Sequence, residues 1–507
     1  MRALLSVYDK TGLEAFASGL AALGIELVAS GGTAQALSRA AIPHRTVEDV
    51  TGAAEMLSGR VKTLHPAIHG GILADLDNPA HLGDLDAQQI EPIALVACNL
   101  YPFSSQPSVE MIDVGGPTMV RAAAKNHAHV TVVVEPAEYG GVLDELRREG
   151  EVSDVTRRRL ARAAFAHVAA YDAAIVSWFD EEAAGDPSAL PPTLHLALER
   201  AQGLRYGENP HQSGARYRRI GGTPGWWDSA VQHGGRELSY LNLFDADFAW
   251  RLVHEVAGLD GSAAAVIVKH ANPCGVAVAA DTATAYRLAF EGDPLSAFGG
   301  IVALSGPVDG ELAEAILANP VADVLVAPGY DEGVPAAFAE RRRNMRALQG
   351  AAPSPLGWGM RQIDGGFLVQ EPDRLLSGRD SWRLVTKAAP SEQQWRDLEL
   401  AWLVCARTSS NAVVLAKAGQ VVGVGCGQQS RVDAAVLAGR KADGRAAGGA
   451  AASDAYFPFR DGLDALADVG VGAVVQPGGS LRDDEIVAAA DERGIAMVLT
   501  GERHFRH

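Results

Sequence analysis

The chain has 507 residues, a formal net charge of −18 and four cysteines. This length is too great for one hydrophobic core and indicates at least two domains. The negative charge disfavours a nucleic-acid-binding surface, although an anionic small molecule would need only a local basic pocket. Because the cysteines form no C-x-x-C pair, we expect free thiols and no structural zinc.

No segment has the character of a membrane span or a signal peptide. The most apolar candidate, residues 161–176, is interrupted by Arg162, His167 and Asp172. The segment Met1–Val7 is too short for the apolar region of a signal peptide. We therefore expect a soluble, cytoplasmic protein that contacts no membrane.

The first half of the chain alternates predicted strands with predicted helices. The strands expected from apolar runs are Leu4–Val7, Ile25–Ala29, Ile93–Cys98 and Val130–Val134. Thr11 is predicted to open the first helix, with Glu14 completing a capping box, and a second helix is expected near Ala34–Ala41. This order predicts a parallel sheet covered by helices.

Four loops near these strand ends suit a ligand that carries phosphate. In Ser30–Thr33, two glycines and a helix N-terminus could cradle a phosphate group. Each of the others has an ordinary alternative, such as a helix cap for Asp113, a helix C-terminus for Lys125 and packing for Tyr101. Their coincidence favours the phosphate ligand. The other three loops are Gly59–Pro66, Cys98–Phe103 and Asp113–Pro117.

The most informative segment of the second half is Val266–Gly275, V-I-V-K-H-A-N-P-C-G. A buried strand, Ala265–Val268, is predicted to end in Lys269 and His270, followed by a turn at Asn272–Gly275. Burial penalises both charged forms and would bring both groups into the range useful for proton transfer. A solvated strand terminus remains an equal alternative on this segment alone.

Further polar segments follow a predicted linker at residues 180–192. Arg205 and Tyr206 combine a bidentate phosphate or carboxylate grip with a ring for stacking. An Ala/Gly-rich stretch, Gly439–Ala452, could be a flexible lid or a helix and is assigned no function. Zinc deaminase chemistry is excluded, because H-x-E is absent and Pro273-Cys274 has no second cysteine at the required spacing. The remaining polar segments are Gly292–Gly300 before a strand at Ile301–Leu304, Ser409–Asn411 before a strand at Ala412–Leu415, Cys426–Arg431, Tyr456–Asp461 and Arg503–Phe505.

Together these motifs closely resemble the bifunctional purine-biosynthesis family that combines phosphoribosylaminoimidazolecarboxamide (AICAR) formyltransferase with IMP cyclohydrolase. The matching motifs include S-G-G-T, G-R-V-K-T-L-H-P, C-N-L-Y-P-F, R-A-A-A-K-N-H, L-R-Y-G-E-N-P-H-Q, K-H-A-N-P-C-G, D-P-L-S-A-F-G-G, G-Q-Q-S-R and F-P-F-R-D. The resemblance implies an α/β protein. Residues 1–191 would form a methylglyoxal-synthase-like parallel-sheet domain, the cyclohydrolase. Residues 192–507 would form a pair of cytidine-deaminase-like subdomains without zinc, the formyltransferase.

The resemblance also implies the reactions and the partners. A formyl group would pass from 10-formyltetrahydrofolate, the co-substrate, to the 5-amine of AICAR, and formyl-AICAR would then lose water and close to IMP. Family members are homodimers that share transferase sites between subunits, and no catalytic metal is implied. Formyl transfer passes through a tetrahedral oxyanion, so the site needs a base and a cation or hydrogen-bond donor.

For the transferase, motif matching makes His270 the proton acceptor and Lys269 the oxyanion stabiliser or proton donor. Asn411 would orient His270 or the carboxamide of the substrate. Gly300 stands where vertebrate members carry an acidic residue. The contacts implied for AICAR and the folate are Arg205, Tyr206, Gly300, Arg431, Tyr456, Phe459, Asp461 and Arg503.

For the cyclohydrolase, the same matching assigns proton transfer to Lys125, Tyr101 and Asp113, with Lys62 beside the nucleotide as a further catalytic residue. The glycine-rich loop would hold the phosphate of the nucleotide. The implied substrate-binding residues are Tyr8, Asp9, Lys10, Ser30, Gly31, Gly32, Thr33, Arg60, Thr63, Asn99, Leu100 and Val114.

Two other functions are compatible with the first half of the chain. It could sense a nucleotide without catalysis, or act as a methylglyoxal-synthase-type lyase. The set of Lys125, Tyr101 and Asp113 argues against a sensor, and either reading leaves the Lys269–His270 pair without a purpose. Turnover of formyl-AICAR by the fragment 1–191 would separate these functions from a cyclohydrolase.

Overall fold

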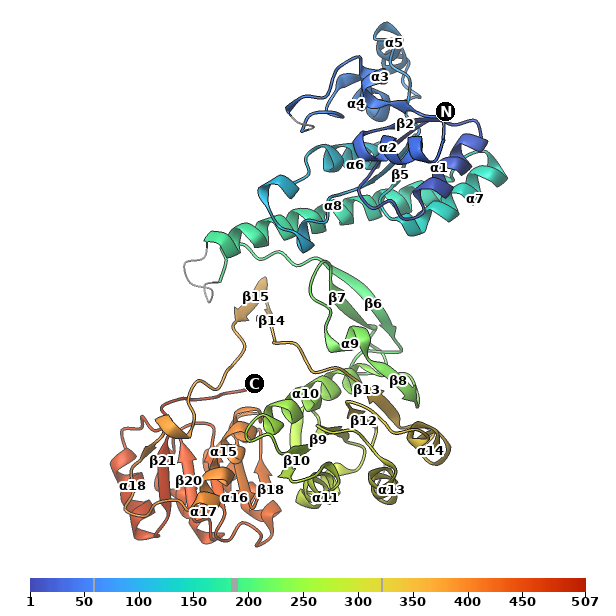
Figure 1. The fold of residues 1–507 in the computed structure, drawn as a ribbon. Helices are drawn as coiled ribbons and strands as arrows, with labels where there is room; N and C mark the ends of the chain where they lie inside the picture. Colours follow the sequence, from blue (N-terminus) through green and yellow to red (C-terminus); the bar gives the residue numbers. More distant parts are fainter. Residues whose placement is uncertain (58–59, 184–189, 321) are drawn as a thin grey trace. The chain divides into compact units, whose positions relative to one another are not determined.

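The structure, a computed structural model, describes residues 1–57, 60–183, 190–320 and 322–507. It divides into two compact units (Figure 1). The first unit is Met1–Glu199 with Arg218–Thr223, and the second is Arg200–Tyr217 with Pro224–His507. Part of the predicted linker, residues 184–189, lies outside the described residues, and the predicted boundary between residues 191 and 192 stays a prediction.

The first unit is built on a five-stranded sheet with the order β3-β2-β1-β4-β5, in which every pair is parallel. The parallel sheet predicted from the alternating pattern is therefore confirmed. Its strands are β1 (Arg2–Val7), β2 (Glu26–Ala29), β3 (Arg45–Thr46), β4 (Leu95–Asn99) and β5 (Thr131–Val133). Its helices are α1 (Leu13–Ala22), α2 (Gly31–Arg39), α3 (Val47–Thr51), α4 (Pro66–Leu73), α5 (Pro79–Ala87), α6 (Gly115–Lys125), α7 (Tyr139–Glu149) and α8 (Asp154–Ala183).

Helices cover both faces of this sheet, as its apolar strands require. On one face α1 and α7 pack together, and the Phe16 and Tyr139 rings stack with their centroids 4.2 Å apart. On the other face α4, α6 and α8 form a second apolar cluster. The predicted capping box of α1 is wrong, because Gly12 caps the helix and the Thr11 hydroxyl donates to Asp9 instead.

The second unit is built on a twelve-stranded mixed sheet with the order β16-β21-β20-β19-β17-β18-β10-β9-β11-β12-β13-β8. Two separate hairpins, β6–β7 and β14–β15, complete the strands. The strands of the sheet are β8 (Val231–Gly234), β9 (Ala263–Lys269), β10 (Asn272–Ala279), β11 (Ile301–Leu304), β12 (Val324–Ala327), β13 (Arg346–Gln349), β16 (Arg383–Leu384), β17 (Val413–Lys417), β18 (Gln420–Gly425), β19 (Ala450–Ser453), β20 (Ala473–Gln476) and β21 (Ala496–Leu499). The hairpins are β6 (Leu198–Leu204) with β7 (Gly214–Arg219) and β14 (Gly359–Ile363) with β15 (Gly366–Gln370).

This sheet contains one topology twice. The first copy runs α10-β9-β10-α11-β11-α13-β12-α14-β13, with a short α12 before β11, and the second runs α15-β17-β18-α16-β19-α17-β20-α18-β21. The copies join where β10 pairs antiparallel with β18, so two similar halves form one sheet. The α/β fold class with a second region of two related subdomains is confirmed. The helices are α9 (Trp226–Ser229), α10 (Tyr240–Ala257), α11 (Thr282–Gly292), α12 (Pro294–Ala297), α13 (Gly310–Ala318), α14 (Val334–Arg341), α15 (Glu392–Ala406), α16 (Arg431–Ala442), α17 (Arg460–Asp468) and α18 (Asp483–Glu492).

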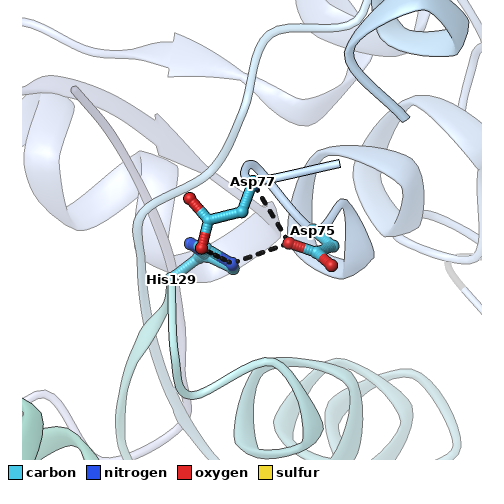
Figure 2. A group of neighbouring side chains, drawn as sticks. All are labelled: Asp75, Asp77 and His129. Atoms are coloured by element: carbon cyan, nitrogen blue, oxygen red, sulfur yellow. Dashed lines mark hydrogen bonds and ion pairs between the residues drawn. The ribbon is translucent and has the colours of Figure 1, made fainter. Parts of the chain in front are cut away.

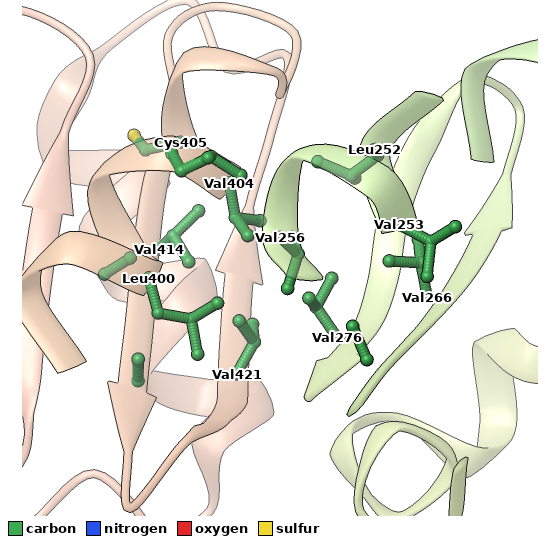
Figure 3. Packing of buried hydrophobic residues seen from close by; sticks show 14 of the residues in the cluster. Leu252, Val253, Val256, Val266, Val276, Leu400, Val404, Cys405, Val414 and Val421 are labelled. Carbon is green, nitrogen blue, oxygen red and sulfur yellow. The ribbon is translucent and has the colours of Figure 1, made fainter. Parts of the chain in front are cut away.

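One apolar cluster spans both copies on a single face of the sheet (Figure 3). There α10 contributes Val256 and α15 contributes Val404, above Val276 of β10 and Val421 of β18. On the opposite face each copy has its own cluster, formed by α11, α13 and α14 in the first and by α16, α17 and α18 in the second. The shared face makes the two copies one folded body.

Local predictions in this unit had mixed outcomes. The strand at Ile301–Leu304 is confirmed as β11. The turn predicted at Asn272–Gly275 is wrong, because these residues begin β10 and the reversal occurs at His270 and Ala271, whose φ angles are 54° and 52°. The strand accommodates Pro273 because its ladder shifts register between Pro273 and Gly275.

Two other sequence expectations concern segments without a proposed role. Gly439–Ala452 is not a lid, since it comprises the end of α16, a connecting turn and the start of β19. All four cysteines fall within the described ranges and are free, with Cys98 and Cys405 buried. In the described part of the chain, no helix is long and apolar enough to cross a membrane.

Close helix–strand packing in each copy predicts a stability effect. A Cβ added to Gly275 would lie 2.0 Å from the Ala289 oxygen of α11, and one added to Gly423 would lie 2.2 Å from the Ala438 oxygen of α16. We expect Gly275→Ala and Gly423→Ala each to lower the free energy of unfolding by about 3 kcal/mol, because backbone must move. Chemical denaturation measures this.

The control is Gly310→Ala, because an added Cβ at this position meets no atom within 4 Å. A change of less than about 0.5 kcal/mol is expected there. Equal effects of the three substitutions would contradict the packing argument.

Candidate functional site

In the first unit, the loops at the carboxyl edge of the parallel sheet are tied together by Asn99. Its Oδ1 accepts hydrogen bonds from the Tyr8 and Asp9 amides at 2.6 and 2.9 Å, and its Nδ2 donates to the Asp9 carbonyl at 3.1 Å. The Tyr8 ring meets the Tyr101 ring edge to face, with centroids 5.6 Å apart. Asn99 is buried and Tyr101 is exposed. This arrangement presents two tyrosines beside the end of β4.

The glycine-rich loop forms the start of α2. Ser30 caps the helix in an extended conformation, and its hydroxyl lies 2.7 Å from the hydroxyl of Ser6. Thr33 is buried, and its hydroxyl bonds both the amide and the carbonyl of Val7. Gly31 has a φ of 43°, a conformation that favours glycine. The Thr33 and Ala34 amides donate to the Ser30 carbonyl, and the Gly31 and Gly32 amides lie in the first turn, where a helix offers them no acceptor of its own.

Two lysines lie beside this helix start. A Cβ on Gly31 would lie 3.2 Å from Nζ of Lys62, and one on Gly32 would lie 3.7 Å from Nζ of Lys10. Lys62 also pairs with Glu55 at 2.8 Å. Two ammonium groups therefore lie beside the start of α2, where they add positive charge to the N-terminal end of the helix dipole.

Asp113 lies at the start of α6 on the same edge. Its Oδ1 accepts from the Gly116 amide at 2.9 Å, and its own amide donates to the Tyr171 hydroxyl at 2.7 Å. Burial raises the pKa of Asp113 above its usual value. The Thr63 hydroxyl is near, since a Cβ on Gly115 would lie 2.9 Å from it. A carboxyl group with a raised pKa therefore lies at the start of α6, close to the loop that carries Thr63.

The structure does not bring every matched residue to this edge. Because α6 returns antiparallel to the strands, it starts at one edge of the sheet and ends at the other. Lys125 is its last residue, and eleven residues span about 16 Å. Lys125 is thus separated from Asp113 by the length of α6, and its role in proton transfer stays a prediction.

The remaining matched residues of the first unit occupy varied settings. Arg60 forms an exposed ion pair with Glu110, and its motif neighbour Gly59 lies outside the described residues. Leu100 is buried beside Gly116, whereas Val114 is exposed just before α6.

A second group of ionisable side chains lies away from this edge. Ligand atoms of Asp75, Asp77 and His129 lie within 4.8 Å of one another (Figure 2). His129 Nε2 is 3.0 Å from Asp75 and 3.9 Å from Asp77, and the Asp77 amide donates to Asp75. These residues follow α4 and α6 at the amino edge of the sheet. Imidazole–carboxylate pairing accounts for the group, and Asp77 is almost fully exposed.

In the second unit, the Lys269–His270 pair sits at the hairpin turn between β9 and β10. Lys269 Nζ donates to the Phe298 carbonyl at 2.7 Å. The amides of His270 and Ala271 donate to the two carboxylate oxygens of Asp245, at 3.0 and 2.8 Å. The predicted burial of the pair is wrong for this chain, because Lys269 is half-buried and His270 exposed. A hairpin reversal places the imidazole at the tip of the sheet edge, which is why it remains accessible.

Strand directions bring this turn to the second copy. Since β9, β10, β18 and β17 alternate in direction, the end of β9 and the start of β17 share one sheet edge. Asn272 Oδ1 accepts from the Ser409 amide at 2.8 Å, which links the turn to the loop Ser409–Asn411. Arg506 donates to the Ala271 carbonyl at 2.8 Å, and its amide donates to the Ser410 hydroxyl. The structure therefore brings Lys269, His270 and Asn411 to one place.

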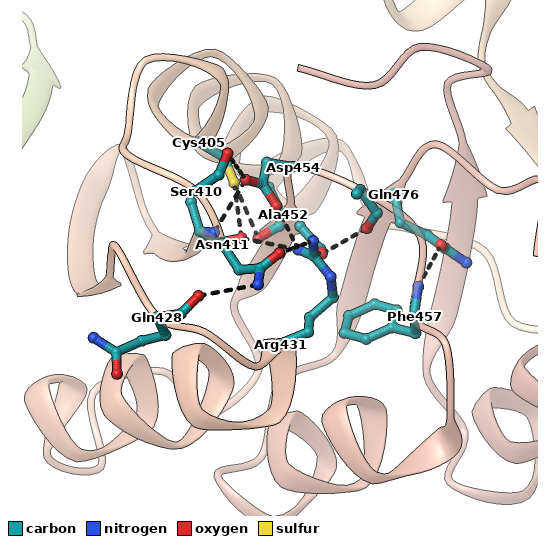
Figure 4. A network of polar contacts seen from close by, with 12 residues as sticks. Cys405, Ser410, Asn411, Gln428, Arg431, Ala452, Asp454, Phe457 and Gln476 are labelled. Carbon is teal, nitrogen blue, oxygen red and sulfur yellow. Dashed lines mark hydrogen bonds and ion pairs between the residues drawn. The ribbon is translucent and has the colours of Figure 1, made fainter. Parts of the chain in front are cut away.

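A buried polar network fixes the Asn411 loop (Figure 4). Asn411 Nδ2 donates to the Gln428 and Gln429 carbonyls, and its Oδ1 accepts from Arg431 at 2.6 Å. Arg431 also forms an ion pair with Asp454, which is fully buried. Thus Arg431, a predicted substrate contact, has its guanidinium engaged by the protein itself.

Other predicted contacts lie along this same edge. Tyr456, Phe459 and Asp461 follow β19, which ends where β17 begins. Tyr456 and Phe459 are exposed, and Arg482 lies over the Phe459 ring at 4.8 Å. Asp461 accepts from the amide of its neighbour Gly462 at 2.7 Å.

Two further predictions concern Arg503 and Gly300. Arg503 lies over the Phe505 ring at 4.5 Å. The neighbouring carboxylate of Glu502 bonds His504 and the Leu376 amide, and among the described ion pairs none joins it to Arg503. Gly300 is buried, and a Cβ there would lie 2.9 Å from the Val268 carbonyl. An acidic side chain at this position would require the backbone to shift.

The Arg205–Tyr206 pair is not brought to His270 within one chain. Arg205 lies over the Tyr206 ring at 5.3 Å. Burial lowers the pKa of Arg346 at the start of β13, and the charge of Arg205 adds to this effect, so the two arginines are neighbours. The strand β13 lies three strands, about 14 Å, from β9, and no described hydrogen bond, ion pair or ring contact joins Arg205 or Tyr206 to Lys269 or His270.

Several residues of these sites were missed from the sequence. Asp245 and Arg506 hold the His270 turn, Asp454 anchors Arg431, and Glu55 pairs with Lys62. Asp245, Arg506 and Asp454 lie more than twenty residues from the groups they contact, and Glu55 lies seven residues before Lys62 across a loop without a periodic pattern, so spacing carried no signal. The sequence holds one signal for Asp245. A helix-capping serine, Ser239, lies six residues before it, and the same spacing recurs between Ser391 and Asp397 in the second copy of the topology.

Comparison with known proteins identifies both regions. A family model described as the AICARFT/IMPCHase bienzyme matches residues 123–441, and one described as an MGS-like domain matches residues 12–127. The chain belongs to the AICARFT/IMPCHase bienzyme family. It is accordingly an AICAR formyltransferase and IMP cyclohydrolase, which carries out the last two steps of IMP synthesis.

Part of the chain is also similar to a solved structure described as "Crystal structure of ForH". Sequence identity is 36%, and the match covers 35% of this chain and 98% of that chain, with a TM-score of 0.33.

The buried pair of Arg431 and Asp454 predicts a large stability effect. Arg431→Leu would leave the Asp454 carboxylate buried without its cation, and we expect the free energy of unfolding to fall by about 3–5 kcal/mol. Urea denaturation followed by tryptophan fluorescence measures this. The control is Arg493→Ala, which breaks exposed ion pairs with Asp464 and Asp468 and should cost less than about 1 kcal/mol. A small effect of Arg431→Leu would contradict the role of the network.

Proposed function

We propose that each activity of this bienzyme has its own site. The cyclohydrolase site is the carboxyl edge of the first unit's sheet, and the transferase site is the edge of the second unit's sheet where the His270 turn meets the Asn411 loop. The observation that carries the transferase assignment is the link between these segments through Asn272 and Arg506. It joins residues from both copies of the repeated topology. Nothing observed favours a sensor or a lyase.

In the transferase site, the 5-amine of AICAR attacks the formyl carbon of 10-formyltetrahydrofolate. His270 takes the proton that the amine loses as the new C–N bond forms. Lys269, whose ammonium already donates to the Phe298 carbonyl, stabilises the oxyanion on the former formyl oxygen. The bond to the folate nitrogen then breaks, and that nitrogen leaves protonated as tetrahydrofolate. Asn411 keeps its geometry through Arg431 and orients His270 or the carboxamide.

In the cyclohydrolase site, the anion site at Ser30–Thr33 holds the phosphate of formyl-AICAR, with Lys10 and Lys62 as counter-charges. The carboxamide nitrogen attacks the formyl carbon, and the formyl oxygen leaves as water. Two protons must move to that oxygen, and Asp113 and Tyr101 are suited to carry them. The raised pKa of the Asp113 carboxyl supports this role, because a carboxyl group that retains a proton more readily can act as an acid.

We further propose a homodimer in which a second copy completes the transferase site. The support is the separation of Arg205 and Tyr206 from His270 within one chain. The hairpin β14–β15 is consistent with a dimer contact, because it leaves Met360, Ile363, Phe367 and Leu368 exposed. In such a dimer the Arg205–Tyr206 pair of one chain binds the AICAR that reacts at His270 of the other.

The two-site proposal predicts separable defects. His270→Ala should lower kcat/KM for formyl transfer by about 10²–10⁴-fold, since the proton acceptor is lost, and leave ring closure of added formyl-AICAR unchanged. Asp113→Asn should lower the rate of ring closure of formyl-AICAR and leave formyl transfer unchanged. Tetrahydrofolate release and IMP formation, followed separately by absorbance, measure the two steps. Loss of both activities in either variant would contradict the assignment.

The dimer proposal predicts complementation between two inactive variants. Arg205→Ala and His270→Ala, expressed together, should regain about a quarter of wild-type formyl transfer, because half of randomly formed dimers are hybrids with one intact site. Each variant alone serves as the control. Failure of the mixture to exceed the variants alone would show that Arg205 acts within its own chain.

A further inference from the structure

The repeated topology places the same carboxylate contact beneath two hairpin turns. In the first copy, Asp245 of α10 accepts from the amides of His270 and Ala271. In the second, Asp397 of α15 accepts from the amides of Ala418 and Gly419, both at 2.9 Å. Both carboxylates are buried.

Only the first of these turns carries the lysine–histidine pair that is predicted to act in formyl transfer. The sequence Lys269-His270-Ala271-Asn272 corresponds to Lys417-Ala418-Gly419-Gln420, so the lysine recurs and the histidine does not. The second turn also lies at the opposite edge of the sheet, because equivalent strands of the two copies run in opposite directions. The second copy therefore offers an internal reference for what the carboxylate does to the fold alone.

The two turns differ in how well their own residues suit the bend. Ala418 has a φ of 52° and Gly419 one of 78°, which places glycine where a two-residue turn of this type prefers it. In the other turn, His270 and Ala271 both have positive φ, a conformation that carries a penalty for residues with a Cβ. The His270 turn therefore depends more on contacts from outside.

Asp245 is placed to supply that support. A carboxylate that accepts two adjacent amides fixes the orientation of both peptide groups, and charge-assisted hydrogen bonds are stronger than neutral ones. Arg506 holds the opposite side of the turn through the Ala271 carbonyl. The backbone of His270 is thereby clamped between two side chains while its imidazole stays exposed.

We propose that Asp245 is a positioning residue for formyl transfer, whose buried carboxylate holds the His270–Ala271 turn so that Lys269 and His270 face the reacting atoms. Asp245 itself does not touch substrate. The proposal rests on the transferase site proposed above. The proposal predicts that the buried Asp245 carboxylate affects the rate of formyl transfer as well as the stability of the fold.

The test compares Asp245→Asn with Asp397→Asn in the full-length protein. An amide offers one acceptor in place of two and presents its own donors to the second turn amide, so both variants lose the same type of contact. We expect the denaturation midpoint to fall in both variants, and further in Asp245→Asn, because the His270 turn has no glycine to relieve its positive φ angles. We expect kcat of formyl transfer to fall about 100-fold in Asp245→Asn with KM for AICAR changed less than 3-fold, and to stay within 3-fold of wild type in Asp397→Asn. Ring closure of formyl-AICAR should be unchanged in both.

A second variant covers the case in which Asp245→Asn folds poorly. Adding Ala271→Gly removes the penalty for positive φ and should raise the denaturation midpoint toward wild type. If Asp245 positions the turn, kcat stays low in this double variant. If kcat returns together with stability, or if Asp397→Asn lowers kcat as much as Asp245→Asn does, the proposal is wrong.

His270→Ala separates this proposal from the assignment on which it rests. If His270→Ala retains formyl transfer, the proposed transferase site fails. If His270→Ala loses formyl transfer and Asp245→Asn keeps its kcat, only the positioning role fails.

Discussion

The antiparallel pairing of β10 with β18 is the contact on which the transferase region depends. It converts two similar half-sheets into one sheet and sets the direction of every strand in the second copy relative to the first. As a result, the end of β9 and the start of β17 come to the same edge, and the His270 turn meets the Asn411 loop. Arg445 strengthens the join, since it follows α16 and donates to carbonyls of Glu291 and Gly292 at the end of α11.

The first unit obtains its site from a simpler constraint. In a parallel sheet all strands end at one edge, so loops distant in sequence meet there without any symmetry. Asn99 then fastens the loop after β1 to the end of β4, and the start of α2 supplies free amides beside Lys62. The same rule places Lys125, the last residue of α6, toward the opposite edge, because a helix that returns between parallel strands ends there.

Predictions from the sequence were correct where a local pattern of residues determines the structure. Apolar runs located β11 and four of the five parallel strands of the first unit, and long motifs identified the family; β3, two polar residues long, has no apolar run and was missed. Prediction failed at the reversal after β9, because Asn272–Gly275 has turn composition while the actual bend uses two non-glycine residues held from outside by Asp245. Contacts made across long sequence separations, such as Asp454 with Arg431 and Arg506 with Ala271, leave no periodic trace in the chain. The burial predicted for Lys269 and His270 also failed, since a buried strand does not determine whether the turn beyond it is covered.

The apolar cluster shared by α10 and α15 has a consequence for how the larger unit unfolds. Each copy of the topology contributes one helix and the inner face of its strands to this cluster, so neither copy encloses it alone. Separation would expose this apolar face together with the unpaired edges of β10 and β18, which invite aggregation. The two copies therefore melt as one cooperative block, and an amide deep in either half exchanges its hydrogen only when the whole block opens. A gene cut between the copies would yield two chains that must find each other before either can fold.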